Sequence, residues 1–150
     1  MKKISQFIKE KRQKKRFKAT EIAEALNLSS TQVSRYETDR SIPPIEIIIK
    51  LSKLLDFSLN ELYITPNTAI TPGKNLGEKI RNIREKKKLT QEELGKLTNK
   101  KPHQIGSYER SESQPNIYTL IEICKILDTS LENLLENEIN KCATKKLILF

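Results

Sequence analysis

The sequence has little of the material from which metal sites, disulfide frameworks and most catalytic centres are built. Its 150 residues contain no tryptophan, one histidine, two cysteines and four glycines. The cysteines, Cys124 and Cys142, match no metal-ligand spacing and hardly make a disulfide framework. We find no nucleophile–base pair, no paired-carboxylate site and no glycine-rich phosphate loop. We therefore expect no enzymatic activity, no metal site and no cofactor.

Long apolar runs are missing as well. No stretch approaches the roughly 18 consecutive apolar residues that suggest a membrane-spanning helix. The N-terminal residues, Met1 to Lys18, carry basic side chains throughout and contain no apolar run, unlike a secretory signal peptide. We expect a cytoplasmic protein with no membrane partner and no evident small-molecule ligand.

Positive charge, by contrast, is abundant. Lysine and arginine together number 28 and aspartate and glutamate 19, which gives a formal net charge of +9. Such an excess favours a polyanionic partner, although charge alone does not name it. The length of the chain allows one ordinary domain or two very small ones.

The sequence repeats itself once, which decides between these two possibilities. A shift of 72 residues aligns residues 8–62 with residues 80–134 without a gap. Identical pairs include Ile8/Ile80, Arg12/Arg84, Glu21/Glu93, Gln32/Gln104, Tyr36/Tyr108, Glu37/Glu109, Pro43/Pro115, Asp56/Asp128 and Leu62/Leu134. The period is too long, and the copies are too few, for a solenoid. Two copies of one small domain is therefore the better interpretation.

Each copy is expected to hold about five short helices and no strand. The expected helices of the first copy begin near Ile4, Lys18–Thr20, Ser29, Ile45 and Leu59. The apolar residues between Ile45 and Leu55 recur at helical spacing, which predicts a core helix. We assign residues 1–64 to the first domain, 65–75 to a linker, 76–135 to the second domain and 136–150 to a C-terminal tail. For that tail, three alternatives stay open: docking on a domain, pairing with another chain, and disorder.

The stretch from Leu28 to Glu37 carries the strongest local signal. Ser29 is a good helix N-cap, and two apolar residues three apart, Val33 and Tyr36, fall on one face and can pack inward. Ser30, Thr31, Gln32 and Arg35 then point elsewhere, with no acidic residue among them. Such side chains suit base edges and phosphates, because Gln and Arg can make bidentate contacts in a major groove. The competing interpretation is an ordinary solvated helix face.

Three motifs connect the two copies with a known family. They are Leu89-Thr90-Gln91-Glu92-Glu93-Leu94, Ser29-x-x-x-Val33-Ser34-Arg35-Tyr36-Glu37, and the closing pattern Leu51-Ser52-Lys53-Leu54-Leu55-Asp56-Phe57-Ser58-Leu59-x-x-Leu62 with its partner at 123–134. In these motifs the sequence resembles the lambda-repressor/Cro-like helix-turn-helix family over residues 4–63 and 76–135. The resemblance implies an all-α chain of two tandem five-helix domains.

The resemblance also implies roles for individual residues. In this family the second helix crosses the DNA backbone and the third lies in the major groove. Phosphate contacts are implied for Gln91 and Arg40, and for Lys18, because Ala19 stands where the first copy would have the glutamine. The residues implied to contact base edges, or to adjoin them, are Ser30, Thr31, Gln32 and Arg35 in the first copy and His103, Gln104 and Ser107 in the second. Glu112 stands opposite Arg40 in the repeat and would be repelled by phosphate.

Two basic runs, Lys14–Arg16 and Lys86–Lys88, allow two interpretations. They are either solvated helix ends that complement the helix dipole or phosphate contacts. Arg12 with Glu37, and Arg84 with Glu109, occur in both copies at the same positions. By resemblance to the family, we predict that each pair forms a partly buried salt bridge between the first and third helices.

These observations favour a sequence-specific regulator of transcription, a repressor in particular, that binds double-stranded DNA. The alternative is a protein-interaction module, such as an antirepressor or an antitoxin-like partner, that uses its helix-turn-helix domains for assembly. One face lined by Arg35, Arg40 and the basic ends of the first helices would support DNA binding, whereas an apolar patch over the third helix would support a protein partner.

Two arrangements on DNA stay open. The 11-residue linker spans at most ~36–40 Å when fully extended, so one chain could cover two half-sites as a pseudo-dimer on an asymmetric operator. The rival is a homodimer, formed for instance through the apolar tail Leu147–Phe150, in which one copy binds DNA and the other supports assembly.

Overall fold

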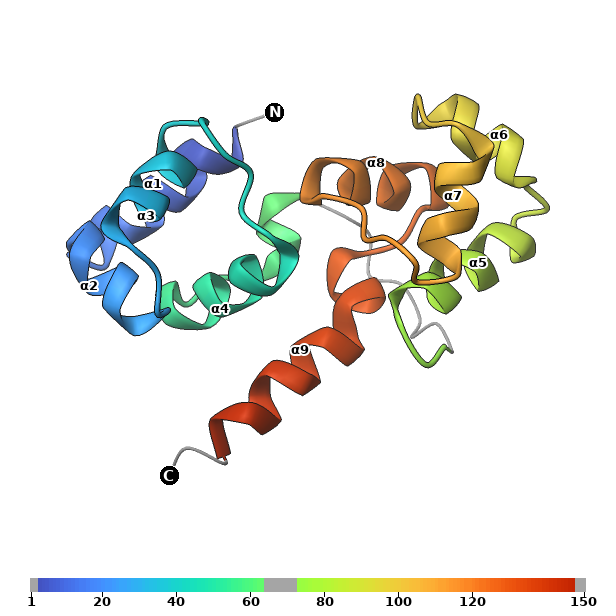
Figure 1. Ribbon diagram of the computed structural model, residues 1–150. Coiled ribbons are helices and arrows are strands. Elements are labelled where there is room, and N and C mark those ends of the chain that lie inside the picture. Colours follow the sequence, from blue (N-terminus) through green and yellow to red (C-terminus); the bar gives the residue numbers. More distant parts are fainter. Residues whose placement is uncertain (1–2, 64–72, 148–150) are drawn as a thin grey trace. The chain divides into compact units, whose positions relative to one another are not determined.

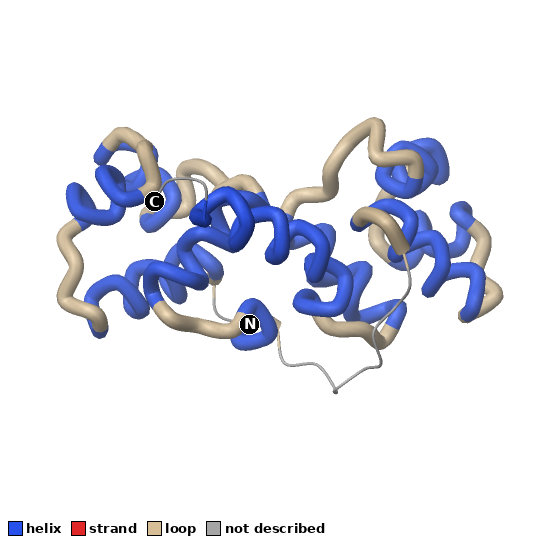
Figure 2. The backbone as a smooth tube through the Cα atoms, turned by 90° about the horizontal axis from the view of Figure 1, so that it is seen from below, coloured by secondary structure: helices blue, strands red, loops and turns tan. Residues whose placement is uncertain are grey.

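The computed structural model describes residues 3–63 and 73–147 of the chain (Figure 1). It divides into two compact units, Met1–Leu62 and Tyr63–Phe150. Within the described ranges every regular element is a helix, which confirms the predicted all-α class (Figure 2). The linker assigned to 65–75 lies mostly outside these ranges, and so does the apolar end of the tail, residues 148–150.

The first unit contains four α-helices and a closing turn of 3₁₀-helix. They are α1 (Ile4–Lys14), α2 (Ala19–Ala25), α3 (Ser30–Glu37), α4 (Ile45–Leu55) and η1 (Leu59–Leu62). The helix-turn-helix pair is α2 and α3, and α1 packs against both α3 and α4. The closing element was expected to be a short helix, and the structure shows it as a single 3₁₀ turn.

The second unit repeats this order in the same register. Its helices are α5 (Leu76–Lys86), α6 (Gln91–Leu97), α7 (Pro102–Glu109), α8 (Ile117–Leu127) and α9 (Leu131–Leu147). Each of the first four has the bounds of its counterpart in the first unit, shifted by 72 residues. The internal repeat of the sequence is thus a repeat of structure.

Backbone conformation repeats as well. Among the described residues, four that are not glycine have positive φ in each unit: Arg16, Asn27, Asp39 and Asp56 in the first, and Lys88, Asn99, Ser111 and Asp128 in the second. These positions again differ by 72. Each lies one to three residues beyond the end of a helix, where a left-handed residue turns the chain out of the helix. The identical Asn and Asp pairs fit this role, because both residues tolerate the left-handed region better than most.

The core of each unit is built around its fourth helix. In α4 the side chains of Ile45, Ile48, Ile49, Leu51 and Leu55 are buried, as the helical spacing predicted. The core residues of α8 lie at the matching positions, and Cys124, at the position of Ser52, is fully buried with them. Burial raises the pKa of this thiol to about 12, so it stays protonated and acts as a small apolar side chain. Cys142 is partly exposed, and neither cysteine forms a disulfide.

The two cores differ where α1 and α5 meet the end of their units. In the first unit Phe7 packs edge-on against Phe57, with ring centroids 5.1 Å apart. In the second unit Lys79 replaces Phe7 and Thr129 replaces Phe57. Lys79 is only 1% exposed, and its Nζ donates to the Asn133 carbonyl at 2.9 Å and to Glu136 Oε2 at 2.8 Å. A polar network has replaced an aromatic pair.

The last helix is longer than expected. The second domain was predicted to end at residue 135, but α9 continues without a break to Leu147. No proline or glycine follows Leu135, so nothing in the sequence ends the helix there. The tail is also tied to its unit near Gly73, whose carbonyl accepts a hydrogen bond from Asn137 Nδ2 at 2.9 Å. Docking, one of the three alternatives for the tail, therefore holds for its first residues.

Over the described ranges, no helix is both long enough and apolar enough to cross a membrane.

Candidate nucleic-acid interface

The third helix of the first unit, α3, is fixed at its start by a reciprocal cap. Ser29 Oγ accepts a hydrogen bond from the backbone N–H of Gln32 at 3.1 Å, and the side-chain Oε1 of Gln32 accepts one from the backbone N–H of Ser29 at 2.9 Å. This is the capping-box arrangement, which satisfies two backbone donors of the first turn. The predicted role of Ser29 as N-cap is confirmed.

The inward face of α3 is apolar. Val33 and Tyr36 are 3% and 8% exposed, as their spacing predicted. The outward face consists of Ser30, Thr31 and Arg35, all exposed, and their side chains have no partner within the described part of the chain. Arg40, in the loop after the helix, is exposed in the same way. The structure thus leaves these hydroxyls and guanidinium groups available to a ligand.

The glutamine of this helix is less available than the sequence suggested. Gln32 is exposed, but its amide oxygen is engaged in the cap, which leaves the NH₂ group as a donor. Bidentate recognition of adenine needs both the oxygen and the nitrogen of the amide. Such a contact would require Gln32 to give up the cap, a cost that sequence reasoning had missed.

A buried ion pair holds α3 against α1. Arg12 Nε and Nη2 donate to Glu37 Oε1 and Oε2 at 2.6 and 2.8 Å, and Arg12 Nη1 donates to the Phe17 carbonyl at 2.8 Å. The side chain of Glu37 is only 7% exposed. The hydrogen bonds to Glu37 raise the pKa of Arg12. The predicted salt bridge is confirmed, and it fixes the end of α3 relative to the rest of the unit.

The second unit forms the same ion pair and extends it. Arg84 Nε and Nη2 donate to Glu109 Oε1 and Oε2 at 2.5 and 3.0 Å, and Glu109 Oε2 also accepts from Gln91 Nε2 at 2.9 Å. Gln91 is the first residue of α6, so one carboxylate joins α5, α6 and α7. A primary amide has two N–H donors, so the second one remains free for a phosphate oxygen. Ala19, the counterpart of Gln91, cannot make this bond, and the nearby Lys18 is exposed just before α2.

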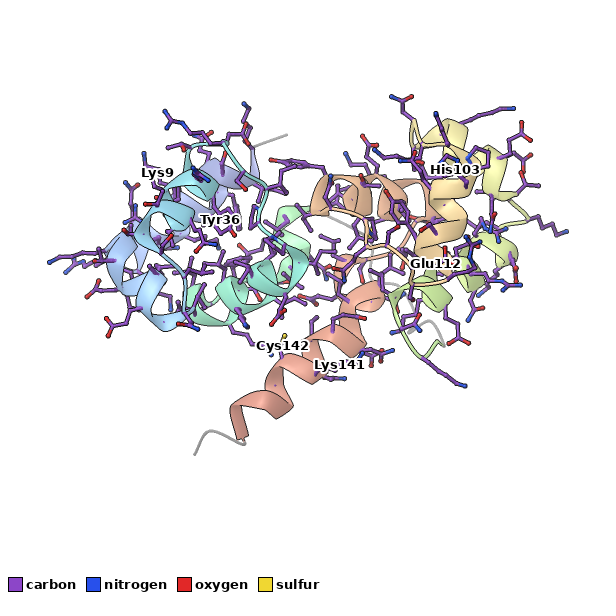
Figure 3. All side chains as sticks on the ribbon, viewed as in Figure 1. Lys9, Tyr36, His103, Glu112, Lys141 and Cys142 are labelled. Carbon is purple, nitrogen blue, oxygen red and sulfur yellow. The ribbon has the colours of Figure 1, made fainter. Side chains whose placement is uncertain are left out.

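The third helix of the second unit, α7, begins at Pro102, where proline suits the first helical position. Gln104 Oε1 accepts from the Lys101 amide at 3.0 Å, so this glutamine is engaged in capping like Gln32. His103 is exposed beside it (Figure 3). Ser107 Oγ lies 2.8 Å from Ser113 Oγ and is hydrogen-bonded to it.

Sequence reasoning missed an ion pair in the loop after α7. Arg110 Nε and Nη2 donate to Glu112 Oε1 and Oε2 at 2.7 and 2.8 Å. The hydrogen bonds from Arg110 lower the pKa of Glu112. Glu112 was expected to repel phosphate, but its charge is neutralised within the loop. The signal was the presence of opposite charges two residues apart at a turn.

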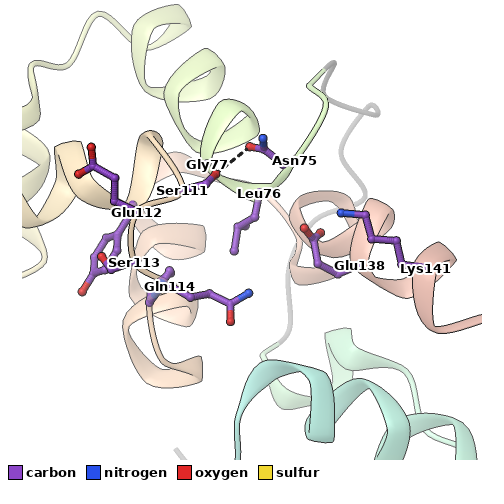
Figure 4. A pocket seen from close by; sticks show the side chains of 11 residues that line it. Asn75, Leu76, Gly77, Ser111, Glu112, Ser113, Gln114, Glu138 and Lys141 are labelled. Carbon is purple, nitrogen blue, oxygen red and sulfur yellow. Dashed lines mark hydrogen bonds between the residues drawn. The ribbon is translucent and has the colours of Figure 1, made fainter.

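A cavity of about 520 Å³ lies beside the same loop in the second unit (Figure 4). Its wall includes Asn75 and Ser111, joined by a hydrogen bond of 3.2 Å, and the oppositely charged Glu138 and Lys141 of α9. The predicted DNA contacts of this unit, Gln91, His103, Gln104 and Ser107, do not line the cavity, although Ser113, which is bonded to Ser107, does. Within residues 3–63 and 73–147, no three His, Cys, Asp or Glu side chains are grouped so as to hold a metal ion.

Comparison with known proteins matches this architecture. The helix-turn-helix family model matches twice, at residues 8–62 and 80–134. A 10 kDa protein of the ImmF control region of Bacillus phage phi105 is 35% identical over 72 residues, which make up 48% of this chain and 80% of that protein. Repressor protein C2 of Salmonella phage P22 is 36% identical over 66 residues, 44% of this chain but only 31% of the repressor. No solved structure is significantly similar.

Proposed function

The chain belongs to the helix-turn-helix family and is a DNA-binding regulator of transcription, and from that premise we propose that it is a repressor that reads the major groove with α3. The observation that carries this proposal is the exposed face of α3. Arg35 and Thr31 stand free on a helix whose opposite face is buried and whose end is held by the Arg12–Glu37 pair. A rigid helix with free donors is what direct reading of base edges requires.

Two features support DNA over a protein partner. The exposed side chains of α3 and of the loop after it carry positive charge at Arg35 and Arg40, with no acidic side chain between Ser29 and Tyr36. The large apolar side chains that are exposed in the described part, Ile42 and Leu97, lie outside α3 and α7. An apolar patch over the third helix, which assembly through that helix would need, is therefore missing from the described surface.

Repression is the mode of regulation that the relatives support. One is named as a repressor, and the other as a protein of a control region. The aligned part covers less than a third of the C2 repressor, so the proposal concerns only what a DNA-binding segment can do. A protein bound in the major groove at a promoter would repress by excluding other proteins from that site. No enzymatic step is part of this proposal.

Selection from a random pool of duplexes tests the proposal. The full chain should enrich a defined sequence and protect it in a footprint, and a reporter gene placed behind that sequence should be repressed. Failure to retain any duplex, together with stable capture of a protein partner through α3, would favour the assembly module instead.

A further inference from the structure

We propose that the two domains divide the work of binding DNA: the first reads the bases, and the second holds the phosphate backbone without reading sequence. This division rests on the proposed function, because it assumes that the chain binds a duplex. The third helices of the two units, α3 and α7, have the same length and the same position in their units but expose different side chains.

The central base-reading position differs most between the two helices. Arg35 of α3 corresponds to Ser107 of α7. Arginine has a long side chain with several donors that can engage a guanine at two points, whereas serine reaches only a short distance. The Ser107 hydroxyl is also bonded to Ser113 Oγ. At this position α7 has lost both reach and free donors.

The loop after the third helix also offers less free positive charge in the second unit than in the first. Arg40 is exposed and without a partner in the described chain, whereas its counterpart Glu112 is held by Arg110 in a two-point pair. Both members of that pair are more than half exposed, so DNA could compete for Arg110. A phosphate that captured Arg110 would, however, leave the Glu112 carboxylate facing the DNA. The net charge of the pair is zero in either arrangement.

One side chain with reach remains on the outward face of α7. Gln104 is engaged in the cap through its amide oxygen, which leaves His103 as the exposed side chain near the front of the helix. A single side chain of this kind supplies little discrimination between base pairs. The second domain therefore lacks the groups for reading sequence that the first domain keeps.

Positive charge, in contrast, is retained around α6 and α7. Between Arg81 and Glu112 every acidic side chain has a partner: Glu85 with Arg81, Glu92 with Lys96, Glu93 with the Thr90 amide, Glu109 with Arg84 and Gln91, and Glu112 with Arg110. Five lysines of this stretch have no partner in the described chain: Lys86, Lys87, Lys88, Lys100 and Lys101. All of these are exposed except Lys100, which is partly buried.

Contacts to phosphate require positive charge and positioned N–H donors, not a pattern of donors and acceptors matched to a base. The lysines supply the charge, and Gln91 supplies a donor held in place by Glu109. The first domain lacks that bond, since Ala19 stands at the position of Gln91. The second domain thus keeps groups that can hold the backbone, while it lacks most of those that read bases.

The test compares variants of the full chain on the duplex selected from the random pool and on a scrambled duplex, each at several salt concentrations. Lys100→Gln with Lys101→Gln should weaken binding to both duplexes by the same factor and lower the salt slope by about two, at roughly 0.9 per phosphate. His103→Ala should leave the ratio of specific to non-specific affinity within about two-fold of the parent. Arg35→Ala should reduce that ratio by roughly 5- to 150-fold.

The paired variant Lys74→Gln with Lys141→Gln removes the same charge from exposed positions outside the proposed contacts, and it is the matched control. Thermal unfolding checks that every variant is folded. A loss of specificity in His103→Ala as large as that in Arg35→Ala would overturn the division, because α7 would then read bases. A lysine variant that behaves like the control would overturn it as well, because the second domain would not hold DNA.

Failure of the proposed function has a different signature. In that case the parent chain enriches no sequence, and base reading by α3 falls with it. The lysine variants measured on random duplex would still decide whether the second domain holds phosphate.

Discussion

Glu109 and Arg84 form a two-point ion pair, and the Glu109 carboxylate also accepts a hydrogen bond from the side-chain amide of Gln91. The carboxylate oxygens lie 2.5 and 3.0 Å from Arg84 and 2.9 Å from Gln91, and the Glu109 side chain is 2% exposed. Removing one member of a buried pair leaves the other charge buried and uncompensated. The free-energy cost of that exceeds the net stabilisation that the intact pair provides. This contact therefore determines how firmly α7 is held against α5 and α6.

We expect Glu109→Gln to lower the free energy of unfolding by ~3–5 kcal/mol, the usual cost of breaking a buried pair. Glu37→Gln should be somewhat less costly, because Glu37 and Arg12 are more exposed and no glutamine depends on them. Urea unfolding followed by circular dichroism measures both. An unchanged midpoint in either variant would mean that its pair contributes no more than an exposed one, roughly 0–1 kcal/mol.

The missing glutamine of the first unit can be restored. Ala19→Gln places an amide where Gln91 lies in the second unit, within reach of Glu37 in the corresponding geometry. A hydrogen bond to a charged group contributes about 1.5–3 kcal/mol, and ordering the side chain costs up to about 2 kcal/mol. We expect a net gain in stability of at most ~1 kcal/mol. Ala19→Met, which has similar length and no amide, is the control, and equal effects of the two substitutions would refute the hydrogen bond.

The helix order was predictable from the sequence because the repeat and the helical spacing agree. Every helix of the first unit reappears 72 residues later, and both salt bridges were expected from the paired identities together with the family resemblance. The structural features that the sequence did not predict lie where the two copies differ. Lys79 occupies an apolar position, and only the joint replacement of Phe57 by Thr129 and of Ile64 by Glu136 signals that its surroundings have become polar.

The candidate site was harder to predict, because residue type does not reveal which donors are already engaged. The outward positions of Ser30, Thr31 and Arg35 follow from helical spacing. The use of Gln32 and Gln104 in capping, and the closure of Arg110 on Glu112, depend on rotamers and on three-dimensional neighbours. The implied DNA contacts of all these residues stay predictions.

Arg35 and Arg40 should have separable effects on DNA binding. Arg35→Ala is expected to cost about 1–3 kcal/mol on the selected duplex and to relax preference at one base position, if the guanidinium contacts a guanine at two points. Arg40→Ala should weaken all duplexes alike and reduce the salt slope by about one. Fluorescence anisotropy on matched and scrambled duplexes separates the two outcomes. Equal losses on both duplexes for Arg35→Ala would contradict a role in reading bases.

The pair formed by Lys11 and Glu61 gives a dependence on pH. Hydrogen bonding from Lys11 lowers the pKa of Glu61 below its ordinary value of 4.5. The folded state therefore favours the ionised carboxyl, so the stabilisation is present above pH 4.5 and is lost as the pH falls through the lower, folded-state pKa. Glu61 is 43% exposed, so the contribution should stay at roughly 0–1 kcal/mol. An NMR titration should show the low pKa in the parent and a return toward 4.5 in Lys11→Met; an identical titration in both would exclude the pair as the cause.

The length of chain between the two domains limits how one chain can lie on its operator. Gly73 and Asn75 are both hydrogen-bonded within the second unit. The Gly73 carbonyl accepts from the Asn137 side chain, and the Asn75 side chain caps the start of α5. The tether between the described parts is then at most the nine residues 64–72, and nine residues span no more than ~30–32 Å when fully extended. Half-sites of helix-turn-helix dimers are about 34–36 Å apart, a distance that the two domains can cover because the domains themselves add to the tether.

We therefore expect a pseudo-dimer, with one chain on an asymmetric site. If the second domain holds only phosphate, one half of the site should be strongly specified and the other protected but free of sequence preference. Doubling the tether with nine Gly and Ser residues should weaken binding by only about three-fold, since effective concentration falls as roughly the −3/2 power of length. Footprinting combined with sedimentation of the complex measures the symmetry of the site and the number of chains. A palindrome occupied by two chains would instead establish the homodimer.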